Sequence, residues 1–428
     1  MIFRARAPRL RSFHSSPRQG NACYMAKGSR FIRHNNRKVC VMQKAETVLS
    51  VIQKRGECGK KLERLYRQLY NPELYIAAYV KLYPNKGALT PGTTNETADG
   101  MSLTKIHQLI EELRYERFQW TPVRRIYIPK REKQGLRPLG IPAWRDKLVQ
   151  EVIRMLLEAY FEPKFSNHSH GFRSQRGCHT ALESIKTTHR GTKWFIEGDI
   201  SKCFDNLDHE VLLNILREDI LDARFISLIR NLLKAGYLEN WVWEATYSGA
   251  PQGGVLSPLL ANIYLDRLDK YVEKVLIPEY HRGIKRRPNP EARHYKYKKT
   301  LAKQHGDREA YKAFDKKQRS VPSYDTHDPE YRRLRYVRYA DDFLLSFAGP
   351  KQEAEKIKEK LATFLKDELR LELSQAKTLV THASQENAYF LGYQIEVQYN
   401  DTWRDSRGQR NANGEISLKM PKTTLQNM

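Results

Sequence analysis

Paired cysteines, long apolar runs and early acidic residues are all missing from this sequence of 428 residues. None of its cysteines forms a C-x-x-C pair, which excludes a zinc ribbon and argues against a disulfide framework. The five cysteines are Cys23, Cys40, Cys58, Cys178 and Cys203. No apolar run is long enough to span a bilayer, so no membrane helix is expected. These absences favour a reducing compartment over secretion.

The segment before Glu46, which is the first acidic residue, contains Arg and Ser without any acid. This composition is typical of a mitochondrial transit peptide. A basic, disordered arm that binds nucleic acid explains it too, as does upstream sequence before a true start at Met25 or Met42, and these explanations are slightly favoured. The protein is therefore expected either in a bacterial cytoplasm or in the mitochondrial matrix.

Positive charge dominates what is present. The chain has 75 Lys and Arg against 49 Asp and Glu, a net charge of +26. A surplus of this size predicts a polyanionic partner, and nucleic acid is favoured over an anionic membrane surface because phosphate contacts release counterions. Residues 281–330 are basic, contain tyrosines and have few aliphatic residues. They are predicted to form a partly helical surface insertion facing nucleic acid, or else a solvated pair of charged helices.

The hydrophobic pattern predicts a mixture of helices and short strands. Helices are expected over residues 44–79, 101–115, 146–160, 210–216, 224–233 and 351–369, near Thr180, and from Ser257 as N-cap with Pro258 as first helical residue. Strands are expected over residues 123–128, 194–200, 371–373 and 389–397, and a strand–turn–strand unit over residues 335–347. Residues 84–100 are rich in Pro, Gly, Thr and Asn and are expected to form a loop.

Two acidic sites lie on apolar strands. Asp199 ends one predicted strand, and Asp341 and Asp342 occupy the turn of the strand–turn–strand unit. A carboxylate beside buried aliphatic residues is unfavourable unless it is paired or binds metal, and two adjacent aspartates repel each other. A divalent cation relieves both effects, and Mg²⁺ prefers carboxylate oxygens. Two such ions about 3.5–4 Å apart can hold the attacking and leaving oxygens of a phosphoryl transfer.

These two sites carry a family resemblance. Residues 339–342 (YADD) resemble the Y-x-D-D box of reverse transcriptases, and residues 199–204 (DISKCF) resemble the box with their first catalytic Asp. The resemblance implies that Asp199 and Asp341 ligate two Mg²⁺ ions, which Mn²⁺ can replace, with a contribution from the Ile200 carbonyl. Asp342 would have a supporting role near the primer end.

The same resemblance implies a site for the incoming dNTP. Phe204 would exclude a nucleotide with a 2′-OH, although a plain core position is its alternative. Gln252, in the box APQGG at residues 250–254, would lie near the nucleotide. Lys130 and Arg137 would grip the triphosphate from the fingers, and Lys377 would be the general acid for pyrophosphate.

Further segments resemble parts of the family that hold template and primer. Residues 170–173 (HGFR), with Arg173, resemble a block that supports the template strand, and a simple capped loop is the alternative. Tyr339, Leu391 and Gly392 would lie close to the primer. The blocks follow the family's order over residues 121–393, and residues 101–117 resemble an extension typical of group II intron proteins.

Proteins of this kind copy their intron RNA into DNA and assist its splicing as maturases. The implied partners are intron RNA as template, a DNA or RNA primer and dNTPs, with no membrane; a homodimer is left open. Family members usually continue into a helical thumb and often a nuclease, and this sequence shows neither before Met428. The alternative function is a catalytically idle or truncated RNA-binding splicing factor; an RNA-dependent RNA polymerase and a basic structural protein rank lower.

The expected fold is an α+β right-hand polymerase fold, with an antiparallel palm sheet backed by helices and mostly helical fingers. The expected divisions are a basic leader (1–45), a helical N-terminal extension (46–120), fingers (121–190), a palm with the basic insertion (191–398) and a tail at the start of a thumb (399–428).

Overall fold

The computed structural model describes residues 31–34, 37–40, 43–129, 135–239, 242–246, 248–249, 253–325, 328–374, 377–398 and 414–421. Its chain divides into two units, residues 1–42 and 43–428. The described part of the first unit is one antiparallel hairpin of β1 (Phe31–His34) and β2 (Arg37–Cys40). The second unit contains every other element described below. The finer division into extension, fingers and palm stays a prediction.

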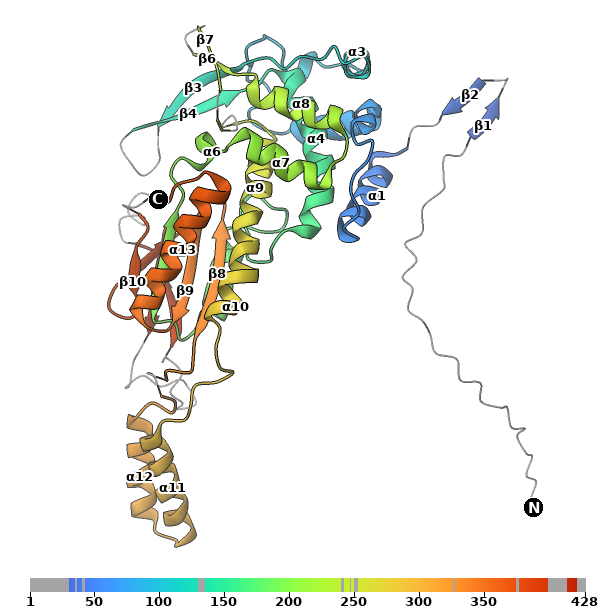
Figure 1. The fold of residues 1–428 in the computed structure, drawn as a ribbon. Helices are drawn as coiled ribbons and strands as arrows, with labels where there is room; N and C mark the ends of the chain where they lie inside the picture. Colours follow the sequence, from blue (N-terminus) through green and yellow to red (C-terminus); the bar gives the residue numbers. More distant parts are fainter. Residues whose placement is uncertain are drawn as a thin grey trace, which may run out of the picture. The chain divides into compact units, whose positions relative to one another are not determined.

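A four-stranded antiparallel sheet, here called the central sheet, organises the second unit (Figure 1). Its strand order is β10 (Val380–His382), β5 (Trp194–Asp199), β9 (Asp342–Ala348) and β8 (Arg333–Tyr339). The predicted strand at 194–200 and the predicted unit at 335–347 are therefore confirmed. The strand order places the end of β5 beside the turn between β8 and β9.

Successive side chains of the central sheet enter two different cores. Ile196 and Leu345 join a large cluster with α9 (Ser257–Tyr271) and α13 (Lys351–Leu369), whereas Phe195 and Leu344 join a smaller one. This follows from the two-residue period of a strand, which sends neighbours to opposite faces. Both faces are thus covered, which explains why β9 is apolar almost throughout.

The smaller core contains α5 (Cys178–Thr188) and a three-stranded sheet of β11 (Ala388–Phe390), β12 (Tyr393–Gln398) and β13 (Glu415–Lys419). The prediction of one strand over residues 389–397 is wrong. Leu391 and Gly392 both have positive φ, at 52° and 78°, and form a two-residue turn that folds β12 back on β11. The expected polar tail also contributes a strand, β13, which pairs with β12.

The second unit also contains a second four-stranded sheet and a layer of helices. The sheet has the order β4 (Leu136–Ile141), β3 (Val123–Pro129), β6 (Tyr237–Glu239) and β7 (Val242–Glu244). The helices are α1 (Ala45–Glu57), α2 (Pro72–Leu82), α3 (Leu103–Arg114), α4 (Trp144–Phe161), α7 (His209–Asp219) and α8 (Ala223–Lys234). Their apolar stripes continue the large core, and α4 packs against α1, α2 and α9. The shorter helical segments are η1 (Tyr66–Tyr70), η2 (Ala98–Gly100), η3 (Glu162–Lys164), α6 (Cys203–Asn206), the π-helical η4 (Val272–Leu276) and α10 (Ile277–Tyr280).

The basic insertion forms a helical hairpin of α11 (Pro290–Gln304) and α12 (Arg308–Ser320), which projects beyond the central sheet (Figure 1). Only Ala292 and Ala302 of α11 are buried, and no residue of α12 is. The prediction of a partly helical surface insertion is confirmed. None of the helices within the described ranges is long and apolar enough to cross a bilayer.

Three other local predictions need correction. Residues 371–373 form no strand, because Arg370 takes a left-handed conformation and the Leu371 amide bonds back to the Leu365 carbonyl, which ends α13. Leu256, not Ser257, is the N-cap of α9. The expected helix over residues 44–79 is broken after α1, where Gly59 has a φ of 63°.

Candidate active site

Three aspartates meet where β5 ends and β9 begins. Asp199 is the last residue of β5 and lies opposite Asp342, the first residue of β9. Asp341 precedes it in a two-residue turn, since Tyr339 pairs with Asp342 across β8 and β9. The register of two strand pairs thus brings together carboxylates that are more than 140 residues apart in sequence (199 to 341).

The electrostatics of this group are unfavourable without a cation. Burial, followed by the charges of Asp341 and Asp199, raises the pKa of Asp342 to about 7. Burial also raises the pKa of Asp341, with Asp199 adding to the shift. Both shifts show that the folded chain resists full ionisation of the three carboxylates.

Lys377 supplies a positive charge at this place. Its Nζ lies 2.6 Å from Asp199 Oδ2, and this hydrogen bond is the main reason that the pKa of Lys377 is raised. Its side chain is half exposed, so the ammonium can move away from the carboxylate and stay in contact with water. Lys377 therefore lies beside the first aspartate, and its role as general acid stays a prediction.

The carboxylates fit a hard divalent cation, because every donor they offer is oxygen. Among the described residues, no group of three or more His, Cys, Asp and Glu side chains is already gathered in metal-binding geometry. The Lys377 ammonium instead contacts Asp199. Ile200, the other predicted ligand, is buried and pairs with Leu373 in an isolated bridge, while the Asp199 carbonyl accepts a hydrogen bond from the Ser374 amide.

A buried ion pair supports the turn that carries Asp341. Arg338 and Asp269 are both fully buried, and Arg338 Nε and Nη2 donate to the two Asp269 oxygens at 2.7 and 2.6 Å. Arg338 Nη1 also donates to the Ala340 carbonyl at 2.7 Å. Ala340 has a φ of 56°, a conformation unfavourable for a residue with a Cβ. The guanidinium therefore holds the strained residue directly before Asp341.

Other side chains complete this buried network. Tyr336 donates its hydroxyl to Asp269 Oδ1 at 2.8 Å, and Arg338 Nη2 donates to Ser169 Oγ at 2.9 Å. Asn262 accepts from Arg338 and donates to the Gly171 carbonyl at 2.8 Å. Sequence analysis missed Arg338 and Asp269, because β8 also carries Arg333 and Arg335 and nothing in the sequence singles out Arg338.

Residues 168–171 extend the edge of the central sheet. The Arg338 amide donates to the His168 carbonyl, and the His170 amide donates to the Arg338 carbonyl. Arg173 secures the loop from inside: its guanidinium pairs with Glu162 and donates to the carbonyls of Ser166 and Ser169. Its donors are thus directed into the protein, so support of a template by Arg173 would act through the loop.

Gly171 is expected to tolerate no side chain. A Cβ there would overlap the Ala340 amide nitrogen, whereas a Cβ at Gly177 in the same loop would meet nothing within 4 Å. Gly171→Ala should cost about 1–3 kcal/mol of folding stability and, by displacing Asp341, slow a reaction centred on the aspartates by up to roughly a hundredfold. Urea unfolding and the rate of that reaction would measure both effects. Gly177→Ala is the matched control, and equal behaviour of the two variants would contradict the assignment.

The comparison with known proteins agrees with this geometry. A family model described as reverse transcriptase (RNA-dependent DNA polymerase) matches residues 128–395. The chain belongs to this family. Membership implies the palm and fingers fold of polymerases, with which the mixed α+β structure agrees. Reverse transcriptases generally use divalent metal ions, as the aspartate group suggests.

The names of several relatives of this reverse transcriptase refer to introns. Group II intron-encoded protein LtrA of Lactococcus lactis subsp. cremoris is 46% identical over 367 residues, 84% of this chain and 61% of the relative. The uncharacterized 91 kDa protein in cob intron of Schizosaccharomyces pombe is 41% identical, over 83% of this chain and 44% of the relative. Nuclear intron maturase 1, mitochondrial, of Arabidopsis thaliana is 28% identical, over 57% and 39%. The chain thus spans between 39% and 61% of the length of these relatives.

Phe204 is the predicted nucleotide-binding residue of the reverse transcriptase that follows Asp199 most closely in the sequence. Phe204 follows the end of β5, is half-buried, and contacts Phe172 edge-on with ring centroids 6.2 Å apart. It packs partly against the large core, so its position combines a core contact with an exposed edge. Gly249 lies directly against the Phe204–Asp205 backbone, where a Cβ would come within 2.6 Å of the Phe204 carbonyl oxygen.

Part of the predicted dNTP site lies outside the described residues. This applies to Lys130 and Gln252. Gly253, next to Gln252, is described: its φ is 102°, and a Cβ there would overlap the Gly140 carbonyl of β4. Arg137 lies on β4 as well, pairs with Ile128 and is exposed. The chain after Gly253 therefore starts in contact with the strand that carries Arg137.

Two of the predicted primer residues pack against the smaller core, which covers one face of the central sheet. Tyr339 is only partly exposed, and a hydrogen bond with Cys178 at the start of α5 raises its pKa to about 12. Leu391 and Gly392 form the turn between β11 and β12, and both Tyr339 and Leu391 pack against the smaller core. One core therefore connects the Asp341 turn with the turn at residues 391–392.

Proposed function

We propose that this protein is an RNA-directed DNA polymerase of a group II intron, which adds dNTPs to a primer on an RNA template. The observation that carries the proposal is the junction of Asp199, Asp341 and Asp342 at the end of β5 and the start of β9. The raised pKa values of Asp341 and Asp342 suit a site for divalent cations, because cations remove the repulsion among the carboxylates.

Asp199 and Asp341 would hold two Mg²⁺ ions, with Asp342 and the Ile200 carbonyl in support. When bound, the ions would neutralise charge on the attacking and leaving oxygens. The primer 3′-OH forms a bond to the α-phosphorus of the dNTP, and the bond to the bridging oxygen breaks to release pyrophosphate. Lys377, whose ammonium lies at Asp199, is placed to give a proton to that leaving group.

Primer extension on an RNA template tests this proposal, with dNTPs compared with NTPs in the presence of Mg²⁺. We expect synthesis from dNTPs only. If the folded protein binds RNA but extends no primer under any of these conditions, the proposal is wrong and the idle splicing factor is favoured.

Phe204→Val probes the sugar selection in the same assay. Removing the ring's exposed edge should raise incorporation of NTPs relative to dNTPs by on the order of tenfold or more. Phe364→Val is a matched control. Phe364 lies on α13 and is also half-buried, but its ring stacks on Tyr271 of α9 with a centroid distance of 4.0 Å. If Phe204→Val prefers dNTPs over NTPs as strongly as the wild type does, Phe204 has a purely structural role.

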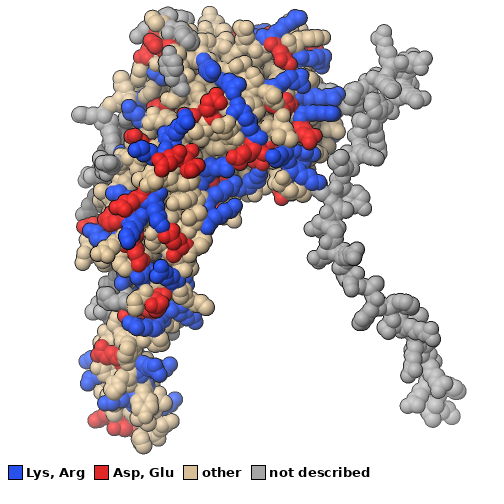
Figure 2. Space-filling view, in the orientation of Figure 1, with Lys and Arg blue, Asp and Glu red and all other residues tan. Residues whose placement is uncertain are grey.

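A second role in RNA binding and splicing is proposed from the charge and from the relatives. The chain carries +26, and Figure 2 shows basic side chains along the α11–α12 hairpin and around its root. Binding of a structured group II intron transcript, compared with an unrelated RNA duplex at the same salt concentration, would test this role. Equal affinity for the two RNAs would argue against it.

A further inference from the structure

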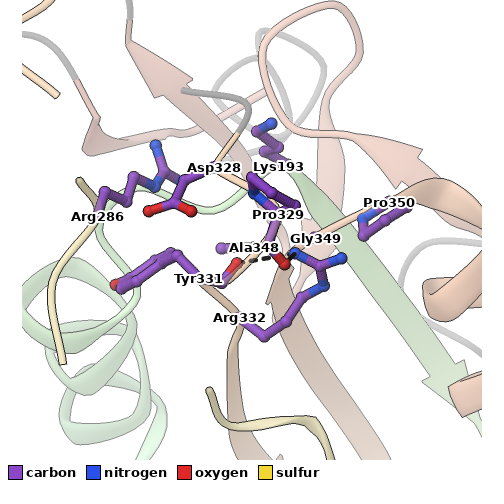
Figure 3. Close-up of a pocket in the computed structure, with 9 residues that line it drawn as sticks. All are labelled: Lys193, Arg286, Asp328, Pro329, Tyr331, Arg332, Ala348, Gly349 and Pro350. Atoms are coloured by element: carbon purple, nitrogen blue, oxygen red, sulfur yellow. Dashed lines mark hydrogen bonds between the residues drawn. The ribbon is translucent and has the colours of Figure 1, made fainter. Parts of the chain in front are cut away.

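A cavity of about 250 Å³ opens at the end of the central sheet farthest from the aspartates (Figure 3). Its lining comes from three places: the residues just before β5, the start of β8 with the end of β9, and the root of the α11–α12 hairpin. The lining residues are Lys193, Arg286, Asp328, Pro329, Tyr331, Arg332, Ala348, Gly349 and Pro350. Because β8 and β9 each have seven residues, roughly 20 Å of strand separates this cavity from Asp341.

Two of the four charges in the cavity already have partners. Arg332 forms a two-pronged ion pair with Glu353, with Nε–Oε2 at 2.6 Å and Nη2–Oε1 at 3.2 Å. Asp328 accepts hydrogen bonds from the backbone amides of Arg287 and Glu330, at 2.7 and 3.0 Å, and these bonds lower its pKa. Asp328 is therefore used to hold the root of the hairpin.

The two remaining charges are both positive. Arg286 donates to the Gly191 carbonyl at 3.3 Å and lies over the Tyr331 ring, so no carboxylate neutralises it within ion-pairing distance among the described residues. The Lys193 backbone bonds to Phe347 and Ala383, but its ammonium forms no hydrogen bond or ion pair with the described part of the chain. Burial, Arg286 and Arg332 lower its pKa, and Asp325 opposes this only in part. A half-buried lysine surrounded by guanidinium groups favours an anion as ligand.

We propose that this cavity binds a backbone phosphate of RNA, at a site separate from the polymerase centre. The cavity is smaller than typical small-molecule sites but holds a phosphate with part of its ribose. Two guanidinium groups, those of Arg286 and Arg333, lie over the Tyr331 ring with centroid distances of 5.0 Å, so a base would have to compete with them to stack on the ring. The contact would therefore fix position and not read sequence.

RNA is favoured over a free phosphate because the cavity continues into the hairpin. Residues 290–320 contain ten Lys and Arg against four Asp and Glu, and α12 buries none of its residues. The hairpin is joined to the cavity by pairing of Asn289 with Ser323 and of Arg282 with Arg332. A strand of RNA lying along the hairpin would reach Lys193 without approaching the aspartates. The inference rests on the proposed RNA-binding role and gives that role a location.

The test uses the full chain and a fluorescently labelled RNA stem–loop, after an unlabelled template–primer duplex has filled the polymerase cleft. Binding is followed by fluorescence anisotropy over a range of KCl concentrations. Lys193→Gln combined with Arg286→Gln should weaken binding about fivefold near 0.1 M salt and reduce the slope of log affinity against log salt by about one. Lys193→Arg should bind like the wild type. Lys366→Gln combined with Arg224→Gln is the charge-matched control on α13 and α8.

Two further measurements separate the possible outcomes. Inorganic phosphate at constant ionic strength should not displace the stem–loop; displacement equal to that of unlabelled RNA would assign the cavity to free phosphate. Primer extension at saturating template–primer should stay within about twofold of the wild type. If the double variant binds RNA with wild-type affinity and slope, the cavity proposal is overturned even where primer extension succeeds. If no primer is extended by any variant but the affinity difference remains, only the polymerase proposal fails.

Discussion

Asparagine in place of Asp341 is expected to abolish DNA synthesis and at the same time to stabilise the metal-free protein above pH 7. The loss of activity should be roughly a thousandfold or more, as for other residues that form the reacting centre. The gain in stability follows from the unfavourable burial of three neighbouring carboxylates. When no cation is bound, the carboxylates of such a site repel one another.

The pH dependence of this gain follows from the raised pKa of Asp342. This carboxyl has a pKa of about 7 in the folded chain against an ordinary value of 3.8. Between these values the folded chain binds a proton that the unfolded chain has released, so the free energy of unfolding decreases as pH rises through this window. Below pH 4 the effect is absent, and above pH 7 it is complete. Asp341→Asn lowers the pKa of Asp342 and should recover roughly 1–2 kcal/mol at pH 8 after allowance for solvent screening.

Urea unfolding in EDTA at pH 5 and pH 8 would measure this stability difference, beside primer extension with Mg²⁺. Millimolar Mg²⁺ should stabilise the wild type at pH 8 and the variant much less, since binding to the folded state alone is what raises stability. Asp367→Asn, at an exposed position on α13, is the control and should change neither quantity. A variant that still makes DNA, or one that is destabilised at pH 8, would contradict this account of the site.

The parts of this site that the sequence predicted are those with a local signal. Residues 335–347 carry two acids between two short stretches rich in aromatic and aliphatic residues, so strand, turn and strand can be recognised without tertiary information. The position of Asp199 at a strand end was equally local. That Asp199 lies opposite Asp342 was implied by the family resemblance alone, because strand pairing between distant segments has no signature in either segment.

The parts that were missed depend on contacts between distant segments or on single backbone conformations. Nothing near Arg338 indicates that it is fully buried, and its partner Asp269 lies 69 residues earlier on α9. The turn at Leu391 and Gly392 depends on two positive φ values, of which only the glycine gave a hint. The wrongly predicted strand at 371–373 has apolar residues because Leu371 closes the end of α13. Apolar residues alone do not distinguish a strand from a segment that closes the end of a helix.

The buried pair of Arg338 and Asp269 is expected to have the largest effect on folding of any described side-chain pair in the site. Arg338→Met alone would leave Asp269 charged in the core with only Tyr336 as a close donor, and should cost about 3–5 kcal/mol. Asp269→Leu alone should cost a similar amount, because Arg338 would then be the unpaired charge. Urea unfolding would give both values. A loss below about 1 kcal/mol in either variant would show that the pair is not isolated from water.

The double variant Arg338→Met with Asp269→Leu separates stability from positioning of the catalytic turn. Replacing both charges by apolar side chains of similar size should recover most of the stability, as for other buried pairs. The Ala340 carbonyl would still lack its donor at 2.7 Å, so the strained residue before Asp341 would relax. We therefore expect kcat for nucleotide addition to stay at least about tenfold low, with little change in the KM for dNTP and a higher Mg²⁺ requirement. If stability and kcat return together, Arg338 only maintains the fold; if stability returns alone, Arg338 positions Asp341 for the reaction.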